Sequence, residues 1–140
     1  MDFVEELKRR GLKVTPQRIA VLRIISQGGH FSGEQIYDTL KKNEPSISLS
    51  TVYNTLETLK QTGLLRSFEA NGVTWYEVNK GSHVNVFCTD TNTIIDANVD
   101  LKSIEDKLEE MGFKVSMLSV IAYAECKEVR RRKVVENQPI

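Results

Sequence analysis

The sequence has few of the residues that would restrict its fold or its chemistry. Its 140 residues include only two cysteines, Cys88 and Cys126, and two histidines. Neither cysteine is followed by a second one at a zinc-binding spacing, so a framework of several disulfides and a complete cysteine zinc motif are both excluded. Reduced thiols are the default expectation. With three prolines and eight glycines, the composition is that of a globular protein.

Net charge and long apolar runs are also missing. Nineteen basic residues balance nineteen acidic ones, which argues against nucleic acid as a partner, since most dedicated nucleic-acid binders are basic. No apolar stretch approaches the length of a membrane span. The residues after Met1 are acidic, whereas a signal peptide begins with basic residues. We therefore expect no membrane partner and a cytoplasmic location.

Residues 1–80 show short helical patterns followed by a hairpin signal. Thr15 and Pro16 predict a helix start, and Ser32 with Gln35 forms a capping-box pattern for a helix from Ser32 to about Lys42. A further helix is expected over 48–61. The pair Asn71–Gly72 lies between two β-prone runs and predicts a type I′ hairpin turn. Helices followed by a hairpin predict a winged helix-turn-helix domain.

The predicted helix over 48–61 has an apolar face and an unusual polar face. The apolar face recurs at helical spacing, and the polar face is rich in short hydrogen-bonding groups, with Glu57 its only charge and Tyr53 at its edge. The polar residues are Ser50, Thr51, Asn54, Thr55 and Thr58. Such a face suits contacts with base edges and phosphates, which favours a recognition helix. An ordinary solvated helix face is the alternative.

Residues 81–140 form a second unit, so the fold class is α+β. Val84, Val86 and Cys88 alternate as a strand, 90–92 is a turn and 93–96 returns. A helix is expected from Leu101 to Met111, capped by Asp100, with a long β-prone run over 113–123. The basic run 130–133 is expected to be a solvated chain end. A unit this small leaves apolar edges uncovered, so pairing with a second copy is expected.

Four strings resemble the ferric uptake regulator family of metal- and peroxide-responsive repressors. They are GLKVTPQR (11–18), HFSGEQIY (30–37), STVYNTL (50–56) and GFKV (112–115). The resemblance implies a homodimer with an N-terminal winged helix, residues 1–80, and an αβ dimerisation and metal-sensing domain, residues 81–140. It implies contacts with a pseudo-palindromic double-stranded DNA operator from Lys13, Thr15, Gln17, Arg18, Ser50, Thr51, Tyr53 and Asn54.

The resemblance also bears on two metal sites. Relatives hold a structural zinc with two cysteine pairs, but Thr91 and Val129 stand where the partners of Cys88 and Cys126 would be, so we expect no structural zinc. Inert buried thiols are favoured over a disulfide between the two. The positions that match the regulatory site are His30, Glu77, His83, Asn85 and Asp96. One Fe²⁺, Mn²⁺ or Zn²⁺ per subunit is implied on His30, Glu77, His83 and Asp96.

Asn85 is a marginal ligand, because it replaces a histidine and offers only a neutral amide oxygen. The leading hypothesis is a repressor whose DNA binding is controlled by this metal at the hinge between the domains. A second hypothesis keeps DNA binding but makes it constitutive or responsive to a non-metal signal such as redox, with the metal positions a relic. A third, a metal-assisted hydrolase, lacks an identifiable nucleophile or phosphate loop, so no enzyme is expected.

Overall fold

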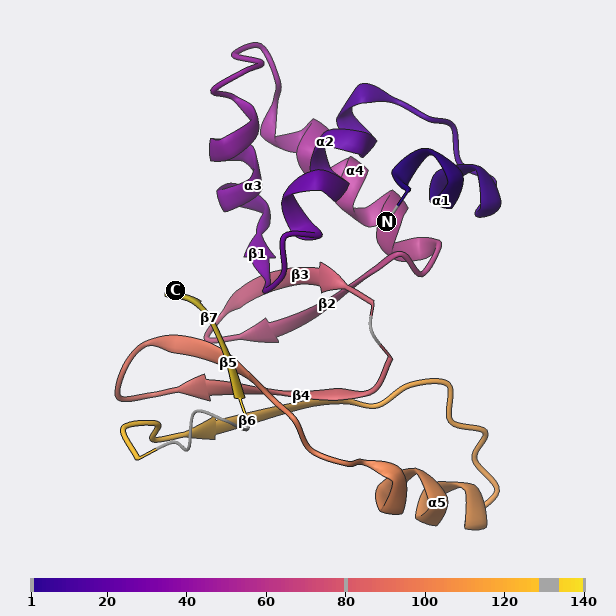
Figure 1. Cartoon of the computed structure of the whole chain (residues 1–140), viewed down its shortest axis with the longest axis vertical. Helices are drawn as coiled ribbons and strands as arrows, with labels where there is room; N and C mark the ends of the chain where they lie inside the picture. The colour runs from indigo at the N-terminus through magenta and orange to yellow at the C-terminus, as the bar shows by residue number, and fades with distance from the viewer. Residues whose placement is uncertain (1, 80, 129–133, 140) are drawn as a thin grey trace. The chain divides into compact units, whose positions relative to one another are not determined.

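A computed structural model describes residues 2–79, 81–128 and 134–139, with side chains described up to residue 128 (Figure 1). The internal contacts divide the chain into two compact units, one ending at Asn79 and the other following it. The fold is α+β, as the sequence predicted. Among the described residues, no helix has the length and apolar character needed to cross a membrane.

The N-terminal unit has four helices and a three-stranded sheet, and Figure 1 shows the helices gathered on one side of the sheet. The helices are α1 (Phe3–Arg9), α2 (Pro16–Ile25), α3 (Gly33–Leu40) and α4 (Leu49–Gln61). The strands are β1 (Phe31–Ser32), β2 (Leu65–Ala70) and β3 (Val73–Val78), arranged in the order β1-β3-β2. This arrangement is the predicted winged helix, with β2 and β3 as the wing.

The helix starts are set by local side-chain hydrogen bonds. The Thr15 and Ser48 hydroxyls accept the backbone N–H groups of Arg18 and Thr51, at the starts of α2 and α4. At the start of α3, Ser32 and Gln35 form a reciprocal capping box. Each cap satisfies backbone donors that have no partner inside the helix. The predicted starts of α2, α3 and α4 are therefore confirmed.

The core of the N-terminal unit is made by the apolar faces of the helices and the wing. From α4 it takes Val52, Leu56 and Leu59, all at most 1% exposed. Leu7 of α1 and Tyr76 of β3 belong to the same cluster. Burying a leucine side chain stabilises a fold by about 1.5–3 kcal/mol, so α4 is fixed by this face and its opposite face remains at the surface.

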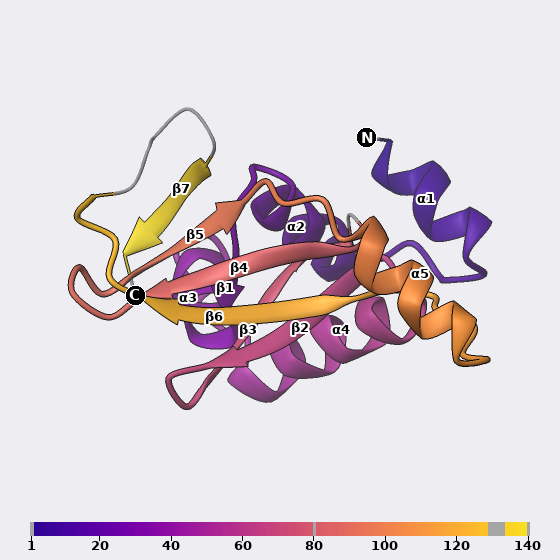
Figure 2. The ribbon, with the colours of Figure 1, turned by 90° about the horizontal axis from the view of Figure 1, so that it is seen from below.

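The C-terminal unit is a four-stranded sheet with one helix. Its elements are β4 (His83–Cys88), β5 (Thr93–Ala97), α5 (Lys102–Glu110), β6 (Ser119–Ala124) and β7 (Val134–Pro139). The order is β6-β4-β5-β7, with β4 parallel to β6 and β5 antiparallel to both β4 and β7. Figure 2 shows α5 beyond one end of this sheet, in the crossover that joins β5 to β6.

Two expectations for the second unit need correction, and one strand was not expected. The run over 113–123 is not one long strand, because β6 begins only at Ser119. The N-cap of α5 is Leu101 rather than Asp100, although the Asp100 carboxylate accepts the Lys102 N–H at 2.9 Å. Strand β7 was not predicted, and the basic run 130–133 lies outside the described residues.

The two cysteines form a disulfide, so the expectation of buried thiols is wrong. Cys88 ends β4 and Cys126 follows β6, and their Cα atoms are 5.4 Å apart. Because β4 and β6 are parallel neighbours, their C-terminal ends lie at the same edge of the sheet. The Asp90 carboxylate supports this edge by accepting the N–H groups of Cys126 and Lys127, which lowers the pKa of Asp90.

Candidate nucleic-acid interface and metal ligands

The polar face of α4 is narrower than the sequence pattern indicated. Asn54 is exposed, with its side-chain amide at the helix surface. The hydroxyls of Thr55 and Thr58 instead donate to the carbonyl groups of Thr51 and Asn54 one turn earlier, each at 2.9 Å. Such bonds turn a hydroxyl towards its own helix. The side-chain amide of Asn54 is therefore the group on this face that is best placed to contact base edges.

The first turn of α4 carries a cluster of hydroxyls. Ser48 Oγ lies 3.1 Å from Ser50 Oγ and 2.8 Å from Thr51 Oγ1, and it also caps the helix. Ser50 is exposed and Thr51 is half-buried. The positive end of the helix dipole and this group of short donors suit a phosphate oxygen.

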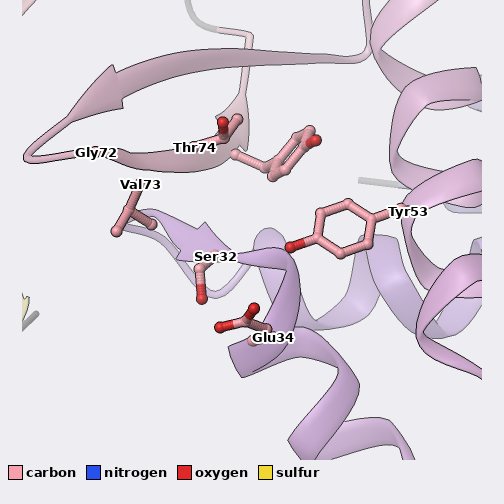
Figure 3. A pocket seen from close by; sticks show the side chains of 7 residues that line it. Ser32, Glu34, Tyr53, Gly72, Val73 and Thr74 are labelled. Carbon is pink, nitrogen blue, oxygen red and sulfur yellow. The ribbon is translucent and has the colours of Figure 1, made fainter.

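Tyr53 is half-buried and lies against α3. A Cβ atom built on Gly33 would come within 2.5 Å of the Tyr53 ring atoms Cε1 and Cζ, so the ring occupies space that only glycine leaves open. Figure 3 shows the Tyr53 hydroxyl directed towards the start of α3. Part of this ring thus serves packing, a role that the sequence pattern did not reveal.

A pocket of about 280 Å³ lies beside Tyr53, between α3, α4 and the wing (Figure 3). It is lined by Ser32, Glu34, Tyr53, Gly72, Val73, Thr74 and Tyr76. Among the described residues that line it, the charged one is Glu34, whose carboxylate repels anions. The pocket is therefore not suited to a DNA phosphate.

Tyr76 links the wing to α4. Its hydroxyl donates to Glu57 Oε2 at 3.4 Å. Burial, followed by the charge of Glu57, raises the pKa of Tyr76 to about 12. The phenol therefore remains a neutral donor at physiological pH and holds the wing against the middle of α4.

The predicted contacts around the start of α2 have mixed environments. Lys13 is exposed, whereas Gln17 and Arg18 are half-buried. Thr15 is occupied as the helix cap, and Arg18 Nη1 donates to the Lys13 carbonyl at 2.7 Å. Lys13 is the long cation here that is best exposed for meeting a phosphate.

Two of the predicted metal positions belong to the N-terminal unit. His30 is completely buried, with Trp75 edge-on to its ring at 5.3 Å between centroids and Phe68 at 5.9 Å. Glu77 is 4% exposed, and its Oε1 lies 3.1 Å from Nε of Arg66, which is also buried.

Sequence reasoning missed Arg66, although the hairpin prediction contained the signal. A two-residue turn pairs residues at equal distances from it, and the turn at Asn71–Gly72 places Arg66 directly opposite Glu77.

The other three predicted positions lie together on one face of the C-terminal sheet. His83 and Asn85 are two residues apart on β4 and so share a face, and Asp96 of β5 lies directly opposite Asn85. The Asn85 amide nitrogen donates to His83 Nε2 at 2.8 Å. Asn85 thereby orients the His83 ring, a different role from that of a ligand.

The donor chemistry of this face fits a divalent transition metal. An imidazole and a carboxylate are ligands that Mn²⁺, Fe²⁺ and Zn²⁺ accept. Asp96 Oδ1 is buried and has no hydrogen-bond partner among the described residues. A buried carboxylate oxygen without a partner is costly, and a bound cation would satisfy it. The sulfur atoms of Cys88 and Cys126 are joined to each other and offer no thiolate.

Comparison with known proteins identifies relatives over most of the chain. The profile of the ferric uptake regulator family matches residues 9–123. The peroxide-responsive repressor of Staphylococcus aureus is 30% identical over 131 residues, covering 91% of this chain and 88% of the relative. The ferric uptake regulator of Pseudomonas aeruginosa with manganese has 27% identity and a TM-score of 0.75, covering 91% of this chain and all of that one. The Campylobacter jejuni peroxide stress regulator has 36% identity and a TM-score of 0.69, covering 92% and 100%.

The contact between Gly33 and Tyr53 predicts a stability coupling. Gly33→Ala should destabilise the N-terminal unit by about 1–3 kcal/mol, because the new methyl group overpacks against the ring. In a Tyr53→Ala background the same change should be neutral or slightly stabilising, since alanine favours a helix. Urea unfolding of the four proteins of this cycle measures the coupling. Equal effects of Gly33→Ala in both backgrounds would contradict the assigned contact.

Proposed function

The chain belongs to the ferric uptake regulator family, and we propose that it is a sequence-specific DNA-binding repressor whose operator affinity is controlled by a divalent metal. The carrying observation is the winged helix, in which α4 buries one face and presents Asn54 and the Ser48–Thr51 hydroxyl cluster on the other. In a helix-turn-helix protein this helix enters the major groove. We propose no enzymatic activity.

The proposed DNA contacts divide by chemistry. Asn54 and Tyr53 would read base edges, and Ser50 and Thr51 would meet the backbone at the start of α4. Lys13, Thr15, Gln17 and Arg18 would contact phosphates around the start of α2. Of these, Lys13, Ser50 and Asn54 are exposed and the others are half-buried.

The proposed active form is a homodimer on a pseudo-palindromic operator. The C-terminal unit exposes large apolar side chains in and after α5, among them Ile104, Met111 and Phe113. Strand β6 lies at one edge of its sheet and exposes Tyr123. A second copy that covers these groups would place two recognition helices on two half-sites.

The proposed sensor takes one Fe²⁺, Mn²⁺ or Zn²⁺ per subunit. His83 and Asp96 would supply ligands from the C-terminal unit, and Glu77 and His30 from the N-terminal unit, with Asn85 marginal. The metal would supply a cationic link across the boundary near Asn79, and so favour one arrangement of the units over others. The buried Asp96 oxygen supports this assignment.

A redox-responsive repressor is the alternative, and the Cys88–Cys126 disulfide favours it. We propose a cytoplasmic location, and in that compartment thiol systems reduce most disulfides. Opening this bond would release the covalent link between the strand ends of β4 and β6. In this version the metal ligands are relics and DNA binding follows the state of the cysteines.

The dimer should form without metal. Sedimentation of the protein after chelation should show a dimer at micromolar concentration, because apolar burial needs no ion. Phe113→Glu with Ile104→Glu should shift it to monomer, whereas Val4→Glu, an exposed site in the N-terminal unit, should not. A wild-type monomer under these conditions would rule out the proposed interface.

On DNA, Asn54→Ala should weaken binding to a selected operator more than binding to random DNA. Lys13→Ala should weaken both and reduce the salt slope by about one, because one phosphate contact is lost. Thr58→Ala is the matched control on the same helix, since its hydroxyl bonds within α4. Equal losses on operator and random DNA for Asn54→Ala would remove its proposed role.

For the sensor, calorimetric titration with Mn²⁺ and Zn²⁺ should show one site per subunit. His83→Ala should weaken binding at least about tenfold, the size of effect seen even for groups that only support a ligand. Asn85→His should tighten binding because it replaces a neutral oxygen with an imidazole. If all three proteins bind alike, or none binds, metal control gives way to the alternative in which DNA binding is constitutive or redox-responsive.

A further inference from the structure

Arg66 and Glu77 form an ion pair inside the wing. They are directly opposed in the β2–β3 register, and Nε of Arg66 donates to Oε1 of Glu77 at 3.1 Å. Their side chains are only 6% and 5% exposed. By contrast, Arg9 and Arg10 both pair with Glu6, and their side chains are 67% and 34% exposed.

Burial makes the two charges depend on each other. Each would be expensive to bury alone, and removing one partner of such a pair leaves an uncompensated charge. At short range in a site with little water, the attraction is several times stronger than in bulk water. Glu77 is therefore already neutralised by a cation that belongs to this chain.

We propose that Arg66 is an internal competitor for Glu77 that sets the metal concentration at which the sensor responds. The inference rests on the proposed function, in which Glu77 is a metal ligand. A divalent ion that recruits Glu77 must take carboxylate charge from the guanidinium and must tolerate a second positive charge beside it. Arg66 thus weakens metal binding. When metal is scarce, it also keeps the buried Glu77 carboxylate paired with a positive charge.

The competition has a direct consequence for metal choice. For an ion that strongly prefers carboxylate oxygen, Glu77 contributes a large part of the binding free energy. Competition from Arg66 therefore weakens the binding of such an ion most. An ion bound chiefly through imidazole nitrogen loses less. Arg66 should therefore penalise Mn²⁺, which suits oxygen ligands, more than Zn²⁺.

The test is calorimetric titration with Mn²⁺ and with Zn²⁺ of wild type and Arg66→Gln, at a temperature where both are folded. Glutamine keeps a hydrogen-bond donor but removes the charge. The affinity for Mn²⁺ should rise about tenfold or more, because the Glu77 carboxylate no longer has to be taken from the guanidinium, and the rise for Zn²⁺ should be smaller. Arg9→Gln, with the same change in net charge at an exposed site, should leave both affinities unchanged.

A double-mutant cycle with Glu77→Gln separates competition for this carboxylate from general charge repulsion. Arg66→Gln should raise the Mn²⁺ affinity strongly when Glu77 is present and by less than about twofold in the Glu77→Gln background, since no carboxylate is left to compete for. The doubly neutral variant also retains a pair able to hydrogen-bond across the strands. If Arg66→Gln is too unstable to titrate, Arg66→Met takes its place with the same expected rise, because methionine fills a similar buried volume without the charge.

The outcomes distinguish the inference from the function beneath it. Metal binding by wild type with an unchanged affinity in Arg66→Gln overturns the role of Arg66 and leaves the metal sensor intact. An equal rise with and without Glu77 also overturns it. Absence of binding in wild type and in every variant overturns the metal sensor itself. Binding that appears only when Arg66 is neutralised supports the competition in its strongest form.

Discussion

The turn at Asn71 and Gly72 sets the register of the wing, and that register decides which side chains of the N-terminal unit meet. Both residues have positive φ angles, 54° and 74°, as a type I′ turn requires. The turn places Arg66 opposite Glu77 and Phe68 opposite Trp75. A slip by one residue would exchange the two faces of one strand. The buried charges would then lose each other, and the aromatic surroundings of His30 would be dispersed.

In the wing, two buried polar side chains each face a specific counterpart. The Arg66 charge faces Glu77, and the Tyr76 hydroxyl faces Glu57. Such groups contribute less to stability than apolar burial does, but they distinguish one arrangement of strand and helix from another. The C-terminal unit contains a similar polar contact, in which the Asn85 amide hydrogen-bonds to His83 and orients its ring. In the proposed sensor, the first kind of contact withholds the ligand Glu77 and the second positions the ligand His83.

Features that depend on neighbours in sequence were predicted from the sequence. The helix starts at Ser32 and Ser48 and the wing turn are local, since each is set within four residues. The packing of Tyr53 against Gly33 and the Cys88–Cys126 disulfide join segments that are distant in the chain. Neither contact produces a periodic pattern in the sequence. Strand β7 was missed because its segment follows a basic run and its role depends on pairing with β5. For the candidate site, the residue types of the donor set were recognisable by resemblance, but the role of Arg66 required the register to be followed strand by strand.

The disulfide also changes how the C-terminal unit transmits mechanical load. Cys88 and Cys126 are 38 positions apart, and the segment between them contains β5, α5 and β6. Tension applied to the two ends of the chain passes directly from one cysteine to the other and bypasses this segment. On the order of 130 Å of extended chain is thereby shielded, and the exposed α5 crossover can be strained or displaced without lengthening the protein. After reduction of this bond, the hydrogen bonds that join β4 to β5 and to β6 would carry that load instead.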